Sequence, residues 1–111
     1  MITLRRNGVS ANGTSLQGYI EADYYDLVRL LGNPDPGYDD KTQAEWAIEV
    51  YDDTFGEVTL TIYDWKQGDA YLGPGNGRLP ENITVWNVGG HDKAALWAIE
   101  SLLRDGWSKA A

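Results

Sequence analysis

The feature that most constrains the fold is a pair of alternating runs at residues 45–51 and 57–63. In each run an apolar side chain stands at every second position, between polar, aromatic or small ones. The apolar positions are Trp46, Ile48, Val50, Val58, Leu60 and Ile62. Successive side chains of a β-strand point to opposite faces, so this period predicts two strands that bury one face. The segment 52–56, which ends in a glycine, predicts a hairpin loop between them.

Local composition predicts further strands and two connections. The expected strands are residues 2–5, 15–20 and 83–88, of which the last is the third strand of a meander. Gly89 and Gly90 are expected to break that strand. The acidic segment 33–43 is expected to be a connection. Residues 66–82 hold four glycines and two prolines without periodicity, which predicts a long loop without secondary structure.

Two helices are expected from apolar positions that recur at helical spacing. Their apolar faces carry Tyr24, Leu27, Val28 and Leu31 in the first helix and Ala95, Leu96, Ile99, Leu102 and Leu103 in the second. Asp23 is the expected N-cap of the first helix, with Asp26 in a capping-box-like position, and Gly32 ends it. Asp92 is expected to cap the second helix, and Gly106 to end it in the left-handed conformation.

The predicted order is therefore β-α-β-β-β-α in a chain of 111 residues and 12.3 kDa. A chain of this size forms one core, so we expect a single domain over residues 1–111. The predicted fold class is α+β, with an antiparallel sheet of about three to five strands and both helices packed on one face. There is no cysteine, which excludes a disulfide scaffold, a cysteine nucleophile and a thiolate metal site.

The net charge of −8 is concentrated in one part of the chain. Between Asp35 and Asp69 lie ten Asp and Glu and two Lys, so this window accounts for the whole excess. This balance argues against sequence-independent binding of nucleic acid or of an anionic membrane, because both require a net positive surface. No apolar run approaches the about 20 residues of a membrane span, and no apolar stretch follows the N-terminal charges. We therefore expect a cytoplasmic protein without membrane contact.

A partner-binding surface is predicted on the sheet face that the helices leave uncovered. This face, with the hairpin tip and the end of the second strand, combines carboxylates with aromatic rings, which suit arginine and lysine side chains. The candidate partner-binding residues are Glu45, Glu49, Tyr51, Asp52, Asp53, Glu57, Tyr63, Asp64 and Trp65, and Thr59 and Thr61 share the face. A solvated face and a homodimer interface are the alternative interpretations of the same pattern.

An alternative ligand site is predicted where the last strand meets the last helix. Glycines allow a ligand to approach the backbone, and helix N-termini attract anions. The candidate residues are Gly89, Gly90, His91 and Lys93, with Tyr71 and Arg78 of the long loop closing over a phosphate-bearing nucleotide. A tight strand-to-helix turn explains the same glycines without a ligand.

Catalysis and metal binding have little support in the sequence. His91 is the only histidine, and no nucleophile motif accompanies it. Asn33, Asp35 and Asp39 do not have the spacing of a calcium loop. We therefore expect neither an enzyme nor a cofactor.

Three segments carry a resemblance to a known group of proteins. They are residues 13–20, 62–66 and 86–91, and together they resemble small uncharacterised accessory proteins of tailed bacteriophages. The resemblance implies a protein that acts in the bacterial host cytoplasm and inhibits a defence component, as anti-CRISPR proteins do. Combined with the acidic window, it predicts a non-enzymatic inhibitor of a host protein with a basic, nucleic-acid-binding surface. The alternative is a sponge for a signalling nucleotide.

Overall fold

The computed structural model describes residues 2–6, 8–36 and 41–106. The two alternating runs form β4 (Ala44–Asp52) and β5 (Gly56–Tyr63), which pair as the predicted antiparallel hairpin. The register places Trp46 opposite Ile62 and Val50 opposite Val58. All four of these side chains are buried, so the alternation does mark one buried face.

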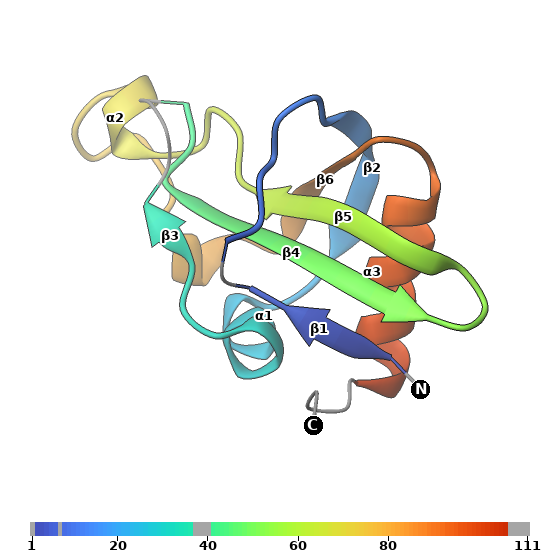
Figure 1. Cartoon of the computed structure of the whole chain (residues 1–111). Coiled ribbons are helices and arrows are strands. Elements are labelled where there is room, and N and C mark those ends of the chain that lie inside the picture. The colour runs from blue at the N-terminus through green and yellow to red at the C-terminus, as the bar shows by residue number, and fades with distance from the viewer. Residues whose placement is uncertain (1, 7, 37–40, 107–111) are drawn as a thin grey trace.

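Four further strands extend the hairpin into a six-stranded antiparallel sheet (Figure 1). They are β1 (Thr3–Arg5), β2 (Ser15–Glu21), β3 (Asp35–Pro36) and β6 (Val85–Gly90). The order across the sheet is β1-β4-β5-β6-β2, and β3 pairs with β4. The α+β prediction is confirmed, with one strand more than expected. That strand is β3, which lies in the segment predicted as a connection.

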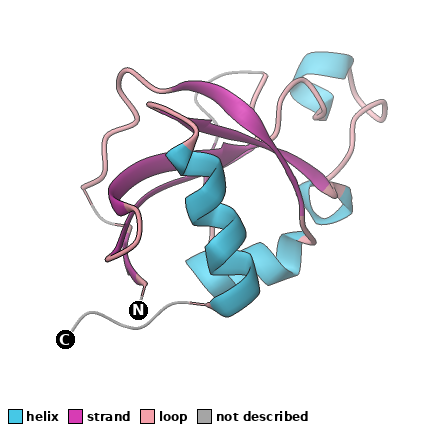
Figure 2. Cartoon of the chain, turned by 90° about the vertical axis from the view of Figure 1, so that its right-hand side faces the viewer, coloured by secondary structure: helices cyan, strands magenta, loops and turns pink. Residues whose placement is uncertain are grey.

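Helices α1 (Tyr24–Leu31) and α3 (Ala94–Asp105) lie on one face of the sheet (Figures 1 and 2). The core beneath them is centred on Trp46 and Trp86, whose rings meet edge to face at 5.4 Å. Trp46 donates its indole N–H to the carbonyl of Gly32, and Trp86 donates to that of Ala22. Both ends of α1 are thereby tied to the sheet. No helix among the described residues is long and apolar enough to cross a membrane.

The C-terminal ends of both helices follow the predictions, whereas the two N-terminal ends do not. The N-cap of α3 is Lys93 and not Asp92, whose carboxylate accepts the backbone N–H of Ala94 at 2.8 Å from one residue earlier. Gly32 and Gly106 follow the two helices with φ angles of 86° and 73°, which glycine adopts without strain. The capping-box interpretation of Asp23 is wrong, because its side chain makes no capping hydrogen bond and only its carbonyl accepts helix N–H groups.

The third strand of the meander continues further than predicted. Gly89 and Gly90 do not break it: they are its last two residues and are buried. A Cβ on Gly89 would lie 2.4 Å from the Thr61 hydroxyl, and one on Gly90 would lie 2.3 Å from the Cβ of Ala95. These glycines therefore serve close packing rather than a flexible turn.

The segment 66–82, predicted as a loop, contains the short helix α2 (Asp69–Leu72) and the 3-10 turn η1 (Pro80–Asn82). Asp69 organises this segment, because its carboxylate accepts the backbone N–H groups of Gly75 and Gly77 at 3.2 and 2.8 Å. The prediction of a structureless loop is wrong.

The two edge strands β1 and β2 determine what covers the other face of the sheet. They lie at opposite edges, so the chain between them has to cross the sheet. Residues 8–14 cross on the face that lacks helices (Figure 1). A short stretch of chain therefore lies above the face that the sequence predicts to be open.

Candidate functional site

The sheet face without helices carries most of the predicted partner-binding residues. Called the open face below, it comprises Glu45, Glu49, Tyr51, Glu57, Thr59, Thr61 and Tyr63 of β4 and β5, with Trp65 just beyond β5. The register places Glu45 opposite Tyr63 and Tyr51 opposite Glu57, so carboxylates and aromatic rings stand side by side. Trp65 continues the row, with its ring edge to face against Tyr63 at 6.3 Å.

Three predicted residues lie outside the open face. Asp64 is fully buried, and its carboxylate accepts the backbone N–H groups of Gln43 and Ala44 at 2.8 and 3.0 Å. It therefore holds the start of β4 and is not offered to a partner. Asp52 and Asp53 lie at the hairpin tip, where Asp52 accepts the N–H of Thr54 and this bond lowers its pKa.

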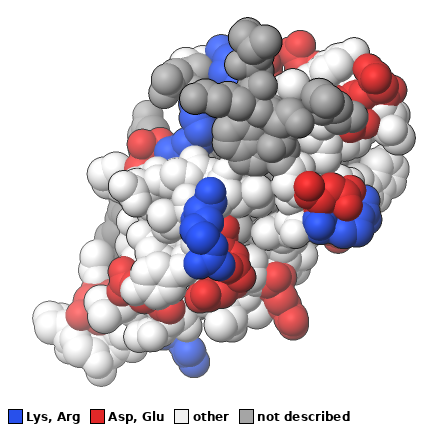
Figure 3. All heavy atoms as spheres, turned by 90° about the horizontal axis from the view of Figure 1, so that it is seen from below, with Lys and Arg blue, Asp and Glu red and all other residues white. Residues whose placement is uncertain are grey.

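Two arginines near the N-terminus pair with acidic residues of the segment 35–69. These pairs were not predicted from the sequence. Arg5 of β1 pairs with Glu49 at 2.9 Å, and Arg6 lies 3.8 Å from Asp35. Figure 3, which views the molecule from below, accordingly shows basic side chains directly beside acidic ones. The open face is therefore a mixture of paired and unpaired carboxylates rather than a uniform acidic patch. The register between β1 and β4 accounts for the Arg5–Glu49 pair, and the Arg6–Asp35 pair depends in addition on β3, which the sequence did not predict.

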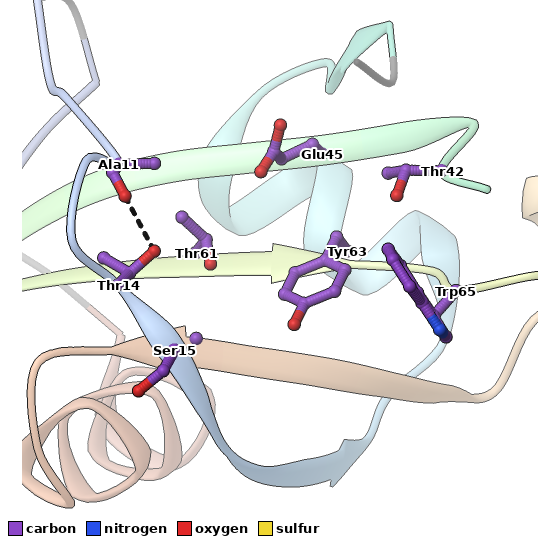
Figure 4. Close-up of a pocket in the computed structure, with 9 residues that line it drawn as sticks. Ala11, Thr14, Ser15, Thr42, Glu45, Thr61, Tyr63 and Trp65 are labelled. Carbon is purple, nitrogen blue, oxygen red and sulfur yellow. Dashed lines mark hydrogen bonds between the residues drawn. The ribbon is translucent and has the colours of Figure 1, made fainter. Parts of the chain in front are cut away.

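A pocket of about 280 Å³ lies between the crossing chain and the open face (Figure 4). It is called the sheet pocket below. Its lining residues are Ala11, Thr14, Ser15, Thr42, Glu45, Thr61, Tyr63, Trp65 and Gly89. Gly89 has no side chain to fill the pocket, and a Cβ at this position would collide with Thr61. The pocket thus joins one residue of the predicted ligand site to three of the predicted partner surface.

Of the described residues that line the sheet pocket, Glu45 alone is charged. Partial burial raises its pKa, and the nearby Asp35 carboxylate, which the register places directly opposite, raises it further. In the described part of the chain, no hydrogen bond or ion pair reaches the Glu45 carboxylate. Like charges that lie opposite each other destabilise a sheet. The ionised carboxylate of Glu45 therefore lowers the stability of the folded protein.

Two lysines stand beside Trp65, whose ring lines the pocket. The Nζ atoms of Lys41 and Lys66 lie 5.7 and 5.8 Å from its ring centroid, and that of Lys66 also lies 5.4 Å from the ring of Tyr71. Lys66 has a φ of 60°, which is unusual for a residue with a Cβ. Backbone strain of this kind is common at binding sites.

The alternative ligand site is not assembled. His91 faces Gly13, and Lys93 donates to the carbonyl of Gln17 at 2.5 Å. Tyr71 belongs to α2, which lies at the other end of the sheet from the connection between β6 and α3 (Figure 1). Arg78 lies in that same distant segment, where its backbone pairs with Gln67 and Gln43. Of this predicted set, only Gly89 lines the sheet pocket.

Among the described residues, no three His, Cys, Asp or Glu side chains form a group that could hold a metal ion. Protein-family models, curated proteins and solved structures give no match to this chain.

Proposed function

We propose that this protein is a non-enzymatic binding protein whose open face engages a partner protein with a basic surface. The observation that carries the proposal is the register of β4 and β5, which places Glu45, Glu57 and their aromatic neighbours on the one face that carries no helix. Carboxylates accept charge-assisted hydrogen bonds from arginine and lysine. Tyrosine and tryptophan add rigid contact area and are common at the centres of interfaces. The face therefore combines the two chemistries that a basic partner requires.

The biological context of the proposal comes from the resemblance of three segments to phage accessory proteins. Such a protein would act by occupying the nucleic-acid-binding surface of a host defence component. Carboxylates arranged on a twisted sheet would then take the place of phosphates. The acidic window and the resemblance both favour this role.

Charge reversal tests the proposal. Immobilised wild-type protein and the Glu57→Lys variant would be incubated with bacterial lysate at low and high salt. Glu57 is exposed, so its reversal should leave the fold intact. We expect the variant and the high-salt wash each to abolish capture of the same basic protein, because salt screens exposed charges. The matched control is Glu100→Lys on α3, which makes the same charge change on the covered side of the sheet. Equal capture by both variants would refute the proposal.

A second candidate is favoured by the lysines at Trp65. Lys41 and Lys66 could pair with the phosphates of a nucleotide whose base stacks on the exposed indole, as a nucleotide sponge requires. A thermal-shift screen with cyclic oligonucleotides and ADP-ribose derivatives tests it. A shift that Lys66→Ala abolishes would support this candidate, and no shift with any of them would exclude it.

A further inference from the structure

The sheet pocket has a chemistry more specific than that of the open face around it. The described residues that line it combine one carboxylate, five hydroxyl groups and two aromatic rings (Figure 4). We infer that this pocket receives the guanidinium group of an arginine side chain of the partner protein. The inference rests on the proposed function and names the group that the partner presents.

The polar groups of the pocket suit a ligand rich in hydrogen-bond donors. Glu45 contributes two acceptor oxygens, to which no described residue donates. The Thr14 hydroxyl donates its own proton to the carbonyl of Ala11 at 2.8 Å, so its lone pairs remain as acceptors. A guanidinium group carries five N–H donors and no acceptor, and it pairs with a carboxylate in a bidentate manner.

The aromatic walls suit a planar cation. Tyr63 and Trp65 meet at 81°, so one ring presents a face where the other presents an edge. Guanidinium groups stack on such rings and are more weakly hydrated than the ammonium group of lysine. Arginine therefore loses less hydration than lysine on entering a half-enclosed pocket.

The size of the pocket favours a side chain over a whole small molecule. At about 280 Å³ it lies below the range of about 300 Å³ and upwards that is typical of pockets for drug-sized ligands. A guanidinium group and its methylene stem need far less room than a nucleotide. The amines of Lys41 and Lys66 lie beside the Trp65 ring, where they would favour an acidic residue next to the arginine of the partner.

The charge of Glu45 fits the same occupant. Partial burial raises the pKa of its carboxylate, and repulsion from Asp35, which lies directly opposite, raises it further. A guanidinium group in the pocket would relieve that repulsion. Without a partner, the negative charge of Glu45 is not neutralised by any described residue. The guanidinium group of the bound partner would neutralise it.

A direct titration tests the inference. The probe is N-acetyl-arginine amide, and the readout is the change in NMR shift of the Trp65 indole N–H and the Thr61 amide. We expect saturable shifts at both positions. The lysine analogue should bind more weakly, and Glu45→Gln should weaken arginine binding about tenfold or more, as expected for loss of a charged hydrogen-bond partner. Glu100→Gln on α3 is the matched control and should bind like wild type.

Three outcomes would overturn the inference: no saturable shift, equal binding by Glu45→Gln, or preference for adenosine or guanosine monophosphate over the arginine probe. Free arginine is a further arm. If it bound much more tightly than the blocked amide, the occupant would be the amino acid and not a partner side chain. Thermal unfolding of each variant confirms that it is folded. The titration needs no partner protein, so its failure is separable from failure of the capture experiment.

Discussion

At the scale of the single residue, Glu45 links the stability of the fold to its proposed function. Burial and Asp35 raise its pKa, so the folded protein binds this proton more tightly than the unfolded chain does. By linkage, stability falls as the pH rises through the unfolded pKa of about 4.3 and then the higher folded pKa. The ionised carboxylate therefore destabilises the protein at neutral pH.

This sign predicts the behaviour of Glu45→Gln. The variant removes the charge and keeps the shape, so at neutral pH its Tm should exceed that of wild type by up to about 4 °C. The difference should vanish near pH 4 and below, where Glu45 is protonated. Thermal unfolding followed by circular dichroism across this pH range measures it. A variant less stable than wild type at neutral pH would mean that an unseen favourable contact holds Glu45.

Lys66 is the second residue at which local geometry has a measurable cost. Its φ of 60° disfavours any side chain with a Cβ. Lys66→Gly and Lys66→Ala both remove the amine from the rings of Trp65 and Tyr71, so they differ only in the backbone. We expect the glycine variant to be more stable by about 1 kcal/mol in urea denaturation. At Thr84, which has a negative φ, the same pair of substitutions should give the opposite order.

At the scale of the element, strand β6 is defined by its packing rather than by its own sequence. Gly90 lies so close to α3 that an added Cβ would meet that of Ala95 at 2.3 Å. Gly90→Ala should therefore destabilise the protein by about 1–3 kcal/mol, the usual cost of overpacking.

The Gly90→Ala/Ala95→Gly double variant makes this prediction specific. It removes the colliding atom, at the usual cost of about 1 kcal/mol for a helical glycine. The double variant should lose less stability than the two single variants lose together. Urea denaturation of the wild type, both single variants and the double variant measures this difference. Additive effects would mean that the strand and the helix do not meet as described.

The predictability of each element follows from the range of the interactions that form it. The β4–β5 hairpin was predictable because its alternation and its turn lie within one short stretch. The strand at Gly89-Gly90 was not, since local preference favours a break and only contacts with Thr61 and Ala95 explain the glycines. Helix α2 was missed for a related reason. The Asp69 carboxylate orders a glycine-rich segment whose composition alone indicates a loop.

At the scale of the whole molecule, the chain brings charges together that are far apart in the sequence. The open face was predictable from strand period, and most of its named residues do share it. The sheet pocket was not, because it requires residues 11–15 to lie over β4 and β5. The pairs that Arg5 and Arg6 make with Glu49 and Asp35 were also missed. A charge count along the chain thus locates the acidic residues but not their counterions.

Arg5 therefore offers a test of whether the open face attracts its partner from a distance. Arg5→Gln should cost little stability, since Arg5 is half exposed in its pair with Glu49 and exposed ion pairs contribute at most about 1 kcal/mol. It leaves Glu49 uncompensated, so association with the captured basic partner should accelerate about twofold or more at low salt. The gain should disappear near 1 M salt, where the Debye length is about 3 Å.

The control for this test is Arg104→Gln. It breaks the Arg104–Asp105 pair on α3 and makes the same change in net charge away from the open face. Surface plasmon resonance at several salt concentrations measures both rates. Equal acceleration by the two variants would assign the effect to net charge alone, whereas acceleration by Arg5→Gln only would locate the encounter on the open face.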